Sequence, residues 1–355
     1  MTPMPPAGST GISRARGPAH RSPPATMTRV PDDGVRILYL AGIPRAGSTV
    51  LGQALGGLPD VTFVGELNFF WRRFAGRELC SCRRPLPECP FWSEVVGRAH
   101  GGVSPGRAKA LAELERRILR RQAPLGLVPA RWPVHRAAGV ATMLAERARL
   151  YRSVARVAGT SWIVDAGKEP VFGSFLARAD HVTFGTIHIV RDPRGVAFSW
   201  KKRVRSDSEP CHMPRHPAAM TAVDWLLQNL MVQLSLQKLS RVYVRVRYED
   251  LVARPGAIVQ GISRATGHAT AGPAAEADDG AAVGAGEHHL VAGNPGVRRH
   301  ADRGLKLRLD DEWRTELPRA DRLIVTAVCA GLMAAYGYPV LAAGDLTRRE
   351  SRSPS

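Results

Sequence analysis

One short segment of the chain has the residue types and spacing of a site that binds a phosphate-like anion. Residues 42–49 read Gly-Ile-Pro-Arg-Ala-Gly-Ser-Thr and lie between an apolar run of strand type, 35–41, and a helical pattern, 48–55. Glycines let the backbone approach an anion, the start of a helix presents unpaired N–H groups, and the hydroxyls of Ser48 and Thr49 add donors. The segment therefore predicts an anion-binding loop at the end of the first strand.

This loop differs from the usual nucleotide-binding loop at one position. Its spacing copies G-x-x-x-x-G-K-[ST], but Ser48 stands where that pattern has its lysine. In nucleoside triphosphatases that lysine reaches the β- and γ-phosphates. The cation here is Arg45, whose planar guanidinium suits one tetrahedral anion. We expect an anion on a 5′ position without a γ-phosphate; the alternative is a glycine-containing turn of no chemical role.

A second anion site is predicted at residues 189–199, Ile-Val-Arg-Asp-Pro-Arg-Gly-Val-Ala-Phe-Ser. Arg191 lies at a predicted strand end, and Ser199 lies about two turns along a helix that starts near Pro193, so both side chains can face one phosphate. Arg194 is a second candidate cation. The alternative is a structural Arg-Asp ion pair at a strand end.

The two segments resemble the nucleotide-binding elements of sulfotransferases that use 3′-phosphoadenosine 5′-phosphosulfate (PAPS). Residues 44–49 are similar to the family's 5′-phosphosulfate loop, and residues 189–199 to its 3′-phosphate element. Segments 164–170, 247–251 and 293–298 follow the family's pattern in the same order. The chain looks closer to the protein-tyrosine and carbohydrate sulfotransferases than to the cytosolic phenol and steroid enzymes.

The resemblance implies PAPS as co-substrate, a hydroxyl or amine of a small molecule or carbohydrate as acceptor, and no required metal. The implied nucleotide-binding residues are Pro44, Arg45, Ala46, Gly47, Ser48, Thr49, Arg191, Ser199 and Arg298. In related enzymes the segment around residues 293–298 closes over the nucleotide, which is why Arg298 is included.

Sulfuryl transfer is an in-line displacement in which positioning and cations on the bridging oxygen contribute most. Glu66 follows the predicted strand 61–64, where strand ends converge on a ligand crevice, and the resemblance makes it the base; the alternative is an ion pair with Arg72 or Arg73. Lys168, one of six lysines in the chain, is assigned to the leaving group, the alternative being a solvated loop lysine. Arg45 is the third catalytic candidate.

Two other functions remain open. A small-molecule kinase with a degenerate loop would use ATP, with Asp165 as a magnesium ligand. A non-catalytic module would use the same pocket to grip an anion or a nucleic-acid backbone.

Three of the five cysteines, Cys80, Cys82 and Cys89, form a C-x-C-x6-C cluster. Zinc needs a fourth ligand, and the segment has neither a C-x2-C pair nor a nearby histidine. The cluster resembles a Cys-rich insertion of bacterial members of the family. We therefore predict a structural role near the mouth of the acceptor site and no metal site, with a metal or a disulfide as alternatives.

The elements that must position these residues alternate between strand and helix. Strand patterns occur at 35–41, 61–64, 162–164, 186–190 and 242–246, and helical patterns at 48–55, 108–121, 137–157, 195–203, 218–239 and 258–265. This alternation predicts an α/β fold, a three-layer P-loop-like parallel sheet with helices on both faces.

Composition divides the chain into one folded domain and two tails. We expect a disordered tail at 1–34, in which Met27 could be the true start, and a polar tail at 347–355. The sulfotransferase domain is expected at 35–346. Within it we expect a helical, Cys-containing insertion on the acceptor side at 68–158 and a mobile Ala/Gly-rich loop at 271–286.

The net charge of +19 comes from 50 Lys+Arg against 31 Asp+Glu. Because 44 of those cations are arginines spread over the whole chain, the charge does not predict a nucleic-acid partner. The first thirty residues have no apolar signal-peptide core, so we expect a cytoplasmic protein. The uncharged run 323–343 contains Gly331, Gly337 and Pro339 and predicts a buried terminal helix, with no membrane span.

Overall fold

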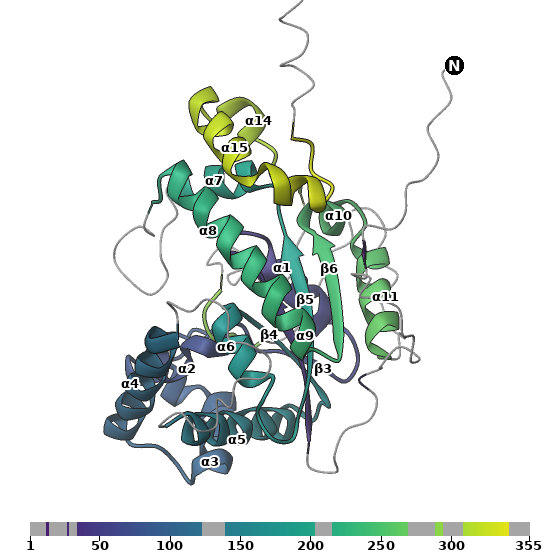
Figure 1. The fold of residues 1–355 in the computed structure, drawn as a ribbon. Coiled ribbons are helices and arrows are strands. Elements are labelled where there is room, and N and C mark those ends of the chain that lie inside the picture. Colours follow the sequence, from purple (N-terminus) through teal and green to yellow (C-terminus); the bar gives the residue numbers. More distant parts are fainter. Residues whose placement is uncertain are drawn as a thin grey trace, which may run out of the picture.

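The computed structural model describes residues 12–13, 27, 34–122, 139–202, 215–268, 288–293 and 308–340. Within these ranges, a six-stranded sheet with the order β1-β6-β5-β2-β4-β3 forms the centre of the molecule (Figure 1). The strands are β1 (Ile12–Ser13), β2 (Val35–Ala41), β3 (Val61–Phe63), β4 (Trp162–Lys168), β5 (Val182–Val190) and β6 (Val242–Arg247). Strands β2 to β6 pair in parallel, and β1 pairs antiparallel to β6. The predicted parallel α/β sheet is confirmed.

The central strand β2 shows why the sheet is covered on both faces. Its side chains alternate between two apolar clusters, with Ile37 and Tyr39 in one and Leu38 and Leu40 in the other. All four are at most 4% exposed. An uninterrupted apolar run is typical of a parallel strand that is buried on both sides.

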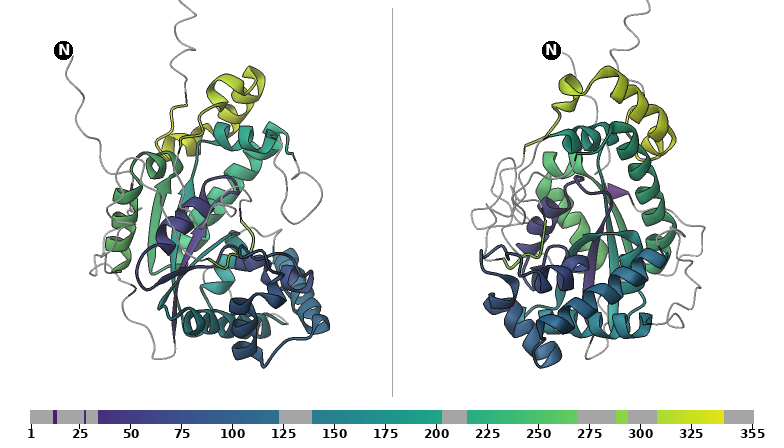
Figure 2. Two further views of the ribbon diagram at one scale, coloured as in Figure 1. Left: turned by 180° about the vertical axis from the view of Figure 1, so that it is seen from behind. Right: turned by 90° about the vertical axis from the view of Figure 1, so that its left-hand side faces the viewer.

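Helices form the outer layers. The cluster around Leu38 and Leu40 includes residues of α1 (Ser48–Gly56) and α11 (Pro255–Thr266). The cluster around Tyr39 includes residues of α5 (Val140–Ala158), α6 (Pro170–Leu176) and the π-helical segment η5 (Val232–Leu236). Near the carboxyl ends of the strands, α15 (Arg319–Ala335) packs against α7 (Pro193–Lys201) and α8 (Ala218–Met231), with the short α14 (Trp313–Glu316) close by (Figures 1 and 2).

A group of helices lies beside the sheet, between β3 and β4 in sequence (Figure 2). It consists of α2 (Phe70–Ala75), α3 (Pro90–His100) and α4 (Pro105–Gln122), with α2 packed on α4 and α3 packed on α5. Trp71 and Trp92 are fully buried in its core. These helices fall inside the range 68–158 that the sequence assigned to an insertion.

The sequence patterns located most of the longer elements and missed several helices. Helices α2, α3, α6, α10 (Tyr248–Ala253) and α14 were not predicted, and the expected helix 218–239 is α8, η5 and the short α9 (Gln237–Leu239) in succession. Helix α15 ends before Gly337, whose φ is 77°, as the Gly and Pro pattern predicted. The expectation that it is buried is wrong, because one face packs on the core while Leu323 and Ile324 are 52% and 42% exposed. Among the described residues, no helix has the length and apolar character needed to cross a bilayer.

Within the amino-terminal segment, the structure describes β1 and Met27, and the composition predicted no order at either position. Met27 is fully buried and donates its N–H to the carbonyl of Thr266 at 3.0 Å. The Met27 carbonyl in turn accepts a hydrogen bond from Arg36 Nε at 2.9 Å. The predicted loop 271–286 and the tail 347–355 lie outside the described residues.

Candidate active site

The carboxyl ends of all five parallel strands contribute residues to one cavity of about 460 Å³. Arg45 follows β2, Glu66 follows β3, Lys168 ends β4, Arg191 follows β5 and Tyr248 follows β6. Strand β2 lies between β4 and β5, where the order of connection reverses. In open α/β sheets, ligands bind in the crevice at such a switch point.

The loop after β2 has the backbone that the sequence pattern predicts. Gly42, Arg45 and Gly47 all have positive φ, at 141°, 74° and 95°. Gly47 precedes α1, and a Cβ atom on it would lie 2.5 Å from a ring carbon of Tyr248. Only glycine fits there, so the loop folds back tightly and directs the amino-terminal end of α1 at the cavity.

The loop's other residues divide between cavity and core. The cavity is lined by Pro44, Arg45, Gly47, Ser48 and Thr49. Ala46 is fully buried and belongs to the apolar cluster beneath the loop. Its side chain therefore supports the loop, and Ala46 can contact a ligand only through its backbone.

Arg45 is held over an aromatic ring and beside two other charges. Its guanidinium carbon lies 5.1 Å from the centre of the Trp200 ring, a cation–π geometry. Burial lowers the pKa of Arg45; the Glu66 carboxylate opposes this shift, and the positive charge of Arg191 adds to it. An anion in the cavity would relieve the repulsion between the two arginines.

Glu66 and Lys168 form an ion pair at the adjacent ends of β3 and β4. Their side chains are 11% and 12% exposed, and Lys168 has a positive φ of 62°, which is uncommon for a residue other than glycine. The alternative partners of Glu66 considered from the sequence were Arg72 and Arg73. Arg73 pairs with Glu78 instead, and both arginines line the cavity.

A buried network fixes the backbone next to Glu66. Asp165 is fully buried; it accepts a hydrogen bond from the N–H of Leu67 at 3.2 Å and another from the hydroxyl of Tyr151. Arg147 donates to the Leu67 carbonyl at 2.6 Å and pairs with the buried Glu115. Burial raises the pKa of Asp165 to about 6.

This network bears on the kinase alternative. Asp165 does not line the cavity, and each of its carboxylate oxygens already accepts a hydrogen bond within the core. A magnesium ligand would have to direct an oxygen at the bound phosphates. The position of Asp165 therefore fits a residue that positions Glu66 better than it fits a metal ligand.

Arg191 follows β5, and in the sheet β5 lies on the other side of β2 from β4 and β3, whose ends carry Lys168 and Glu66. Arg191 donates to the Arg45 carbonyl at 3.1 Å and to the Asp310 carbonyl at 2.9 Å, and its guanidinium carbon lies 4.5 Å from the centre of the Tyr248 ring. Its Nη2 is also 3.2 Å from the Asp310 carboxylate, and Ser199 lines the same cavity. The structure thus brings the predicted Arg and Ser to one cavity, where Asp310 pairs with the arginine.

Other candidates are placed elsewhere. Arg194 is 2% exposed, pairs with Asp192 at 2.6 Å and donates to the Pro339 carbonyl, so its assignment as a second phosphate cation is wrong: it joins the α7 start to the carboxyl-terminal segment. His188 is a satisfied core histidine, since it is fully buried and its two ring nitrogens bond Asn229 and Tyr243 at 2.7 and 2.6 Å. Arg298 lies outside the described residues.

Several cavity residues were not named as site residues from the sequence. They are Val50, Phe69, Arg72, Arg73, Trp200, Tyr248, Ala292, Gly293 and Asp310, of which Tyr248 and Gly293 lie in segments that the resemblance marked. Tyr248 and Trp200 adjoin strand ends or helix positions that were already singled out, so their neighbourhood was a usable signal. In total the cavity has five cationic side chains against two carboxylates, which favours an anionic ligand with several charges.

A second cavity, of about 650 Å³, adjoins the first. The two share Phe69 and Arg72 as lining residues, and the second extends along α2 and α4 to Glu169. Burial raises the pKa of Glu169. Glu169 directly follows Lys168, so consecutive residues at the end of β4 line the two cavities.

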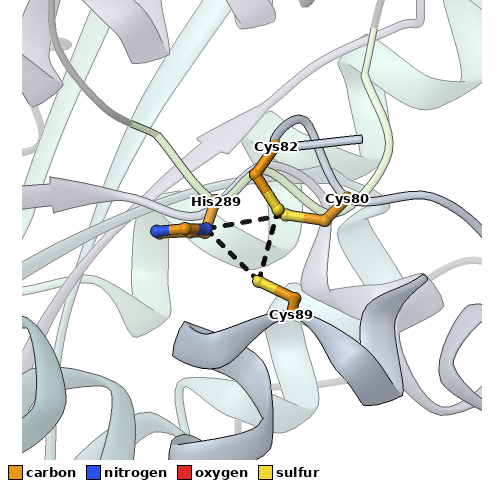
Figure 3. A group of neighbouring side chains, drawn as sticks. All are labelled: Cys80, Cys82, Cys89 and His289. Carbon is orange, nitrogen blue, oxygen red and sulfur yellow. Dashed lines mark hydrogen bonds between the residues drawn. The ribbon is translucent and has the colours of Figure 1, made fainter. Parts of the chain in front are cut away.

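The cysteine cluster has a histidine that the sequence did not reveal. Cys80, Cys82, Cys89 and His289 each offer one ligand atom, and these atoms all lie within 4.8 Å of one another (Figure 3). The expectation of no nearby histidine is wrong, because the 288–293 segment runs back past the cysteines. The absence of a nearby histidine was the reason for predicting no metal site, so that prediction is no longer supported.

Comparisons with known proteins find structural similarity only. No protein-family model and no curated protein matches the chain. The sulfotransferase domain of an olefin synthase from Synechococcus PCC 7002 is similar at 20% identity and a TM-score of 0.45, over 88% of this chain and 99% of that domain. The sulfotransferase domain of the curacin biosynthetic pathway is 15% identical with a TM-score of 0.47, over 86% and 99%.

A third similar structure is the sulfotransferase STF9 from Mycobacterium avium. It is 12% identical with a TM-score of 0.47, over 86% of this chain and 78% of that protein. The assignment of the fold to the α/β class rests on the strand order and helix layers described above.

Proposed function

We propose that this protein is a sulfotransferase that transfers a sulfuryl group from PAPS to a hydroxyl or amine of a small-molecule or carbohydrate acceptor. The observation that carries the proposal is the convergence of the loop, Glu66, Lys168 and Arg191 on one cavity at the carboxyl ends of the parallel strands. These residues come from positions 45 to 191, and their types match what sulfuryl transfer requires.

The cavity suits a nucleotide with phosphates on two positions of its sugar. The amino-terminal end of α1 and the hydroxyls of Ser48 and Thr49 would hold the 5′-phosphosulfate, with Arg45 stacked on Trp200 as its cation. Arg191 and Ser199 would hold the 3′-phosphate. For this, Arg191 must exchange its contact with the Asp310 carboxylate for the phosphate, and Asp310 keeps Lys202 as a partner at 3.0 Å.

Bound PAPS supplies an activated sulfuryl group attached to a phosphate leaving group. Glu66 removes the proton from the acceptor hydroxyl as the acceptor oxygen bonds to sulfur. Lys168 and Arg45 stabilise the negative charge that the leaving phosphate gains as its bond to sulfur breaks. Glu66 and Lys168 are paired with each other, and each turns to its own reacting group when both substrates are bound.

The second cavity is the proposed acceptor site. It meets the nucleotide cavity at Phe69 and Arg72 and is bounded by α2 and α4. An acceptor there would direct its hydroxyl past Phe69 toward Glu66. Both cations and carboxylates line it, including Lys109 and Arg120 beside Glu169, so polar acceptors with hydroxyl or amine groups suit it.

Incubation with radiolabelled PAPS and a panel of phenols, sugars and amines, in a short assay with EDTA, tests the proposal. We expect label transfer to at least one acceptor, and loss of transfer in Glu66→Gln. A parallel incubation with ATP and Mg²⁺ tests the kinase alternative. Phosphate transfer in that arm, without transfer from PAPS, would overturn the proposal.

A further inference from the structure

We infer that Cys80, Cys82, Cys89 and His289 form a structural zinc site that ties the helical group beside the sheet to the segment that positions Glu66. Three ligands come from one short stretch, and the fourth comes from a residue 200 positions further along the chain (Figure 3). The inference does not depend on the proposed sulfotransferase function.

Three of the distances between ligand atoms are close to the edges of a tetrahedral zinc site, and all four atoms lie within 4.8 Å of one another. Cys82 Sγ lies 3.6 Å from Cys89 Sγ, and His289 Nδ1 lies 3.3 Å from Cys89 Sγ and 3.9 Å from Cys80 Sγ. A tetrahedron with Zn–S bonds of about 2.3 Å and a Zn–N bond of about 2.0 Å has edges of about 3.5 to 3.8 Å. A disulfide requires sulfur atoms about 2.05 Å apart, so the observed spacing favours a metal between the thiols.

The backbone brings the cysteines together in a tight turn. The N–H of Cys80 donates to the Arg84 carbonyl and that of Arg83 donates to the Cys80 carbonyl, both at 2.9 Å, and Arg83 has a positive φ of 66°. Cys89 directly precedes α3, where the helix dipole favours a thiolate. Cys80 and Cys89 are buried, at 2% and 0% exposure.

His289 is held in place independently of the thiols. The Phe91 ring stacks on its imidazole, with ring centres 5.0 Å apart and planes at 2°, and Trp92 Nε1 donates to its carbonyl at 2.9 Å. The Ser81 hydroxyl donates to the His288 carbonyl at 2.5 Å and accepts the N–H of Leu290 at 2.7 Å. These contacts keep Nδ1 directed at the cysteines, as an ordered ligand shell requires.

All four ligands of the proposed site come from the protein, and this indicates a structural role for the metal. Four protein ligands leave no open position for a substrate or water, which is the pattern of structural zinc. Two residues after His289, the Val291 carbonyl accepts the N–H of Glu66 at 2.6 Å, and Ala292 and Gly293 line the nucleotide cavity. Zinc bound here would fix one wall of that cavity and the backbone of Glu66.

Metal analysis of the full-length chain without an affinity tag tests the inference. After expression with zinc in the medium and gel filtration, mass spectrometry of the metals should find one Zn²⁺ per chain. Replacement by Co²⁺ should give the intense visible bands of tetrahedral cobalt with thiolate charge transfer. A zinc-free protein, or a Cys82–Cys89 disulfide in the intact mass under non-reducing conditions, would overturn the inference.

Two variants and a matched control identify the ligands. Cys89→Ser and His289→Ala should each lose the bound zinc, whereas Cys329→Ser should keep it, because Cys329 is buried outside the cluster and contacts the Ala222 carbonyl. If the ligand variants do not fold, X-ray absorption of the wild-type zinc protein decides the matter. A shell of three sulfurs and one nitrogen supports the site, and a shell of oxygen and nitrogen alone contradicts it.

Discussion

The ammonium of Lys168 and the carboxylate of Glu66 meet in an ion pair that links the ends of β4 and β3, and about a tenth of each side chain is exposed, 12% and 11%. The pair lines the cavity at the carboxyl ends of the strands, and Glu169, the residue after Lys168, lines the second cavity. The proposed base and the proposed leaving-group cation are thus held together in the proposed donor site.

Substitution of either partner should reduce turnover far more than it reduces nucleotide binding. We expect Glu66→Gln to lower kcat by about 10²- to 10⁴-fold, the usual contribution of a positioned base. Lys168→Ala should lower it by about 10²- to 10³-fold, because a preorganised charge at the leaving group is lost. Steady-state transfer from radiolabelled PAPS measures both.

Lys201→Ala is the matched control for the lysine. Lys201 pairs with Asp321, with side chains 31% and 24% exposed, and does not line the cavity, so its loss should leave kcat within about twofold, as expected for a partly exposed ion pair away from the substrates. Equal losses of activity in the Lys168 and Lys201 variants would speak against a catalytic role for Lys168.

Arg191 and Asp310 should change nucleotide affinity in opposite directions. Arg191→Ala removes a charge-assisted contact to the 3′-phosphate and should weaken binding of 3′,5′-adenosine bisphosphate by about 10- to 100-fold. Asp310→Asn removes the carboxylate that competes for Arg191 and should strengthen it several-fold. Titration calorimetry measures both, and an Asp310→Asn variant with weaker binding would contradict the exchange proposed for Arg191.

The loop tolerates no side chain at Gly47. Gly47→Ala places a Cβ atom 2.5 Å from the Tyr248 ring at a φ of 95°, so we expect about 1 to 3 kcal/mol of destabilisation and loss of nucleotide binding. Gly97→Ala is the control, since a Cβ there meets nothing within 4 Å in α3. It should stabilise the protein by about 0.5 to 1 kcal/mol. Urea denaturation measures the free energy of unfolding of both variants. Equal changes in that free energy would contradict the steric role of Gly47.

Asp165 should make stability depend on pH. Its pKa rises from an ordinary value of 3.8 to about 6 on folding, so the folded protein binds this proton more tightly. The resulting stabilisation is complete below about pH 4 and is lost as the pH rises through 6. Asp165→Asn lacks this titration, and its free energy of unfolding relative to wild type should increase by up to about 3 kcal/mol between pH 4 and 7.

Urea denaturation at several pH values measures this difference. A difference between variant and wild type that stays constant over the range would show that Asp165 is ionised throughout. The same titrations on Glu94→Gln, a carboxylate in an exposed ion pair with Arg98, provide a reference for a group that is not buried.

The sequence was sufficient to locate the parts of the site that adjoin strand ends. Arg45, Glu66, Lys168 and Arg191 each follow or end an apolar run, and parallel strands necessarily bring these positions to one edge of the sheet. Strands β2, β4 and β5 were readable because they are buried on both faces. Short helices such as α2 and α6 were missed because so few residues give no clear period.

Contacts between distant segments could not be predicted in the same way. His289 joins the cysteines because the 288–293 segment pairs with Gly65, and no local pattern records that pairing. Asp310 reaches Arg191 from 119 residues away. Arg194 was misassigned because an arginine beside a phosphate-binding element and one in a buried pair with Asp192 have the same local sequence.

The affinity of the wild-type protein for three adenine nucleotides tests the central claim, that the cavity binds a nucleotide phosphorylated on its sugar. Titration calorimetry with 3′,5′-adenosine bisphosphate, adenosine 5′-monophosphate and ATP should show the bisphosphate binding at least about tenfold more tightly than either other nucleotide, because only it engages Arg191. Equal affinity for the bisphosphate and the monophosphate, or tighter binding of ATP, would contradict the claim.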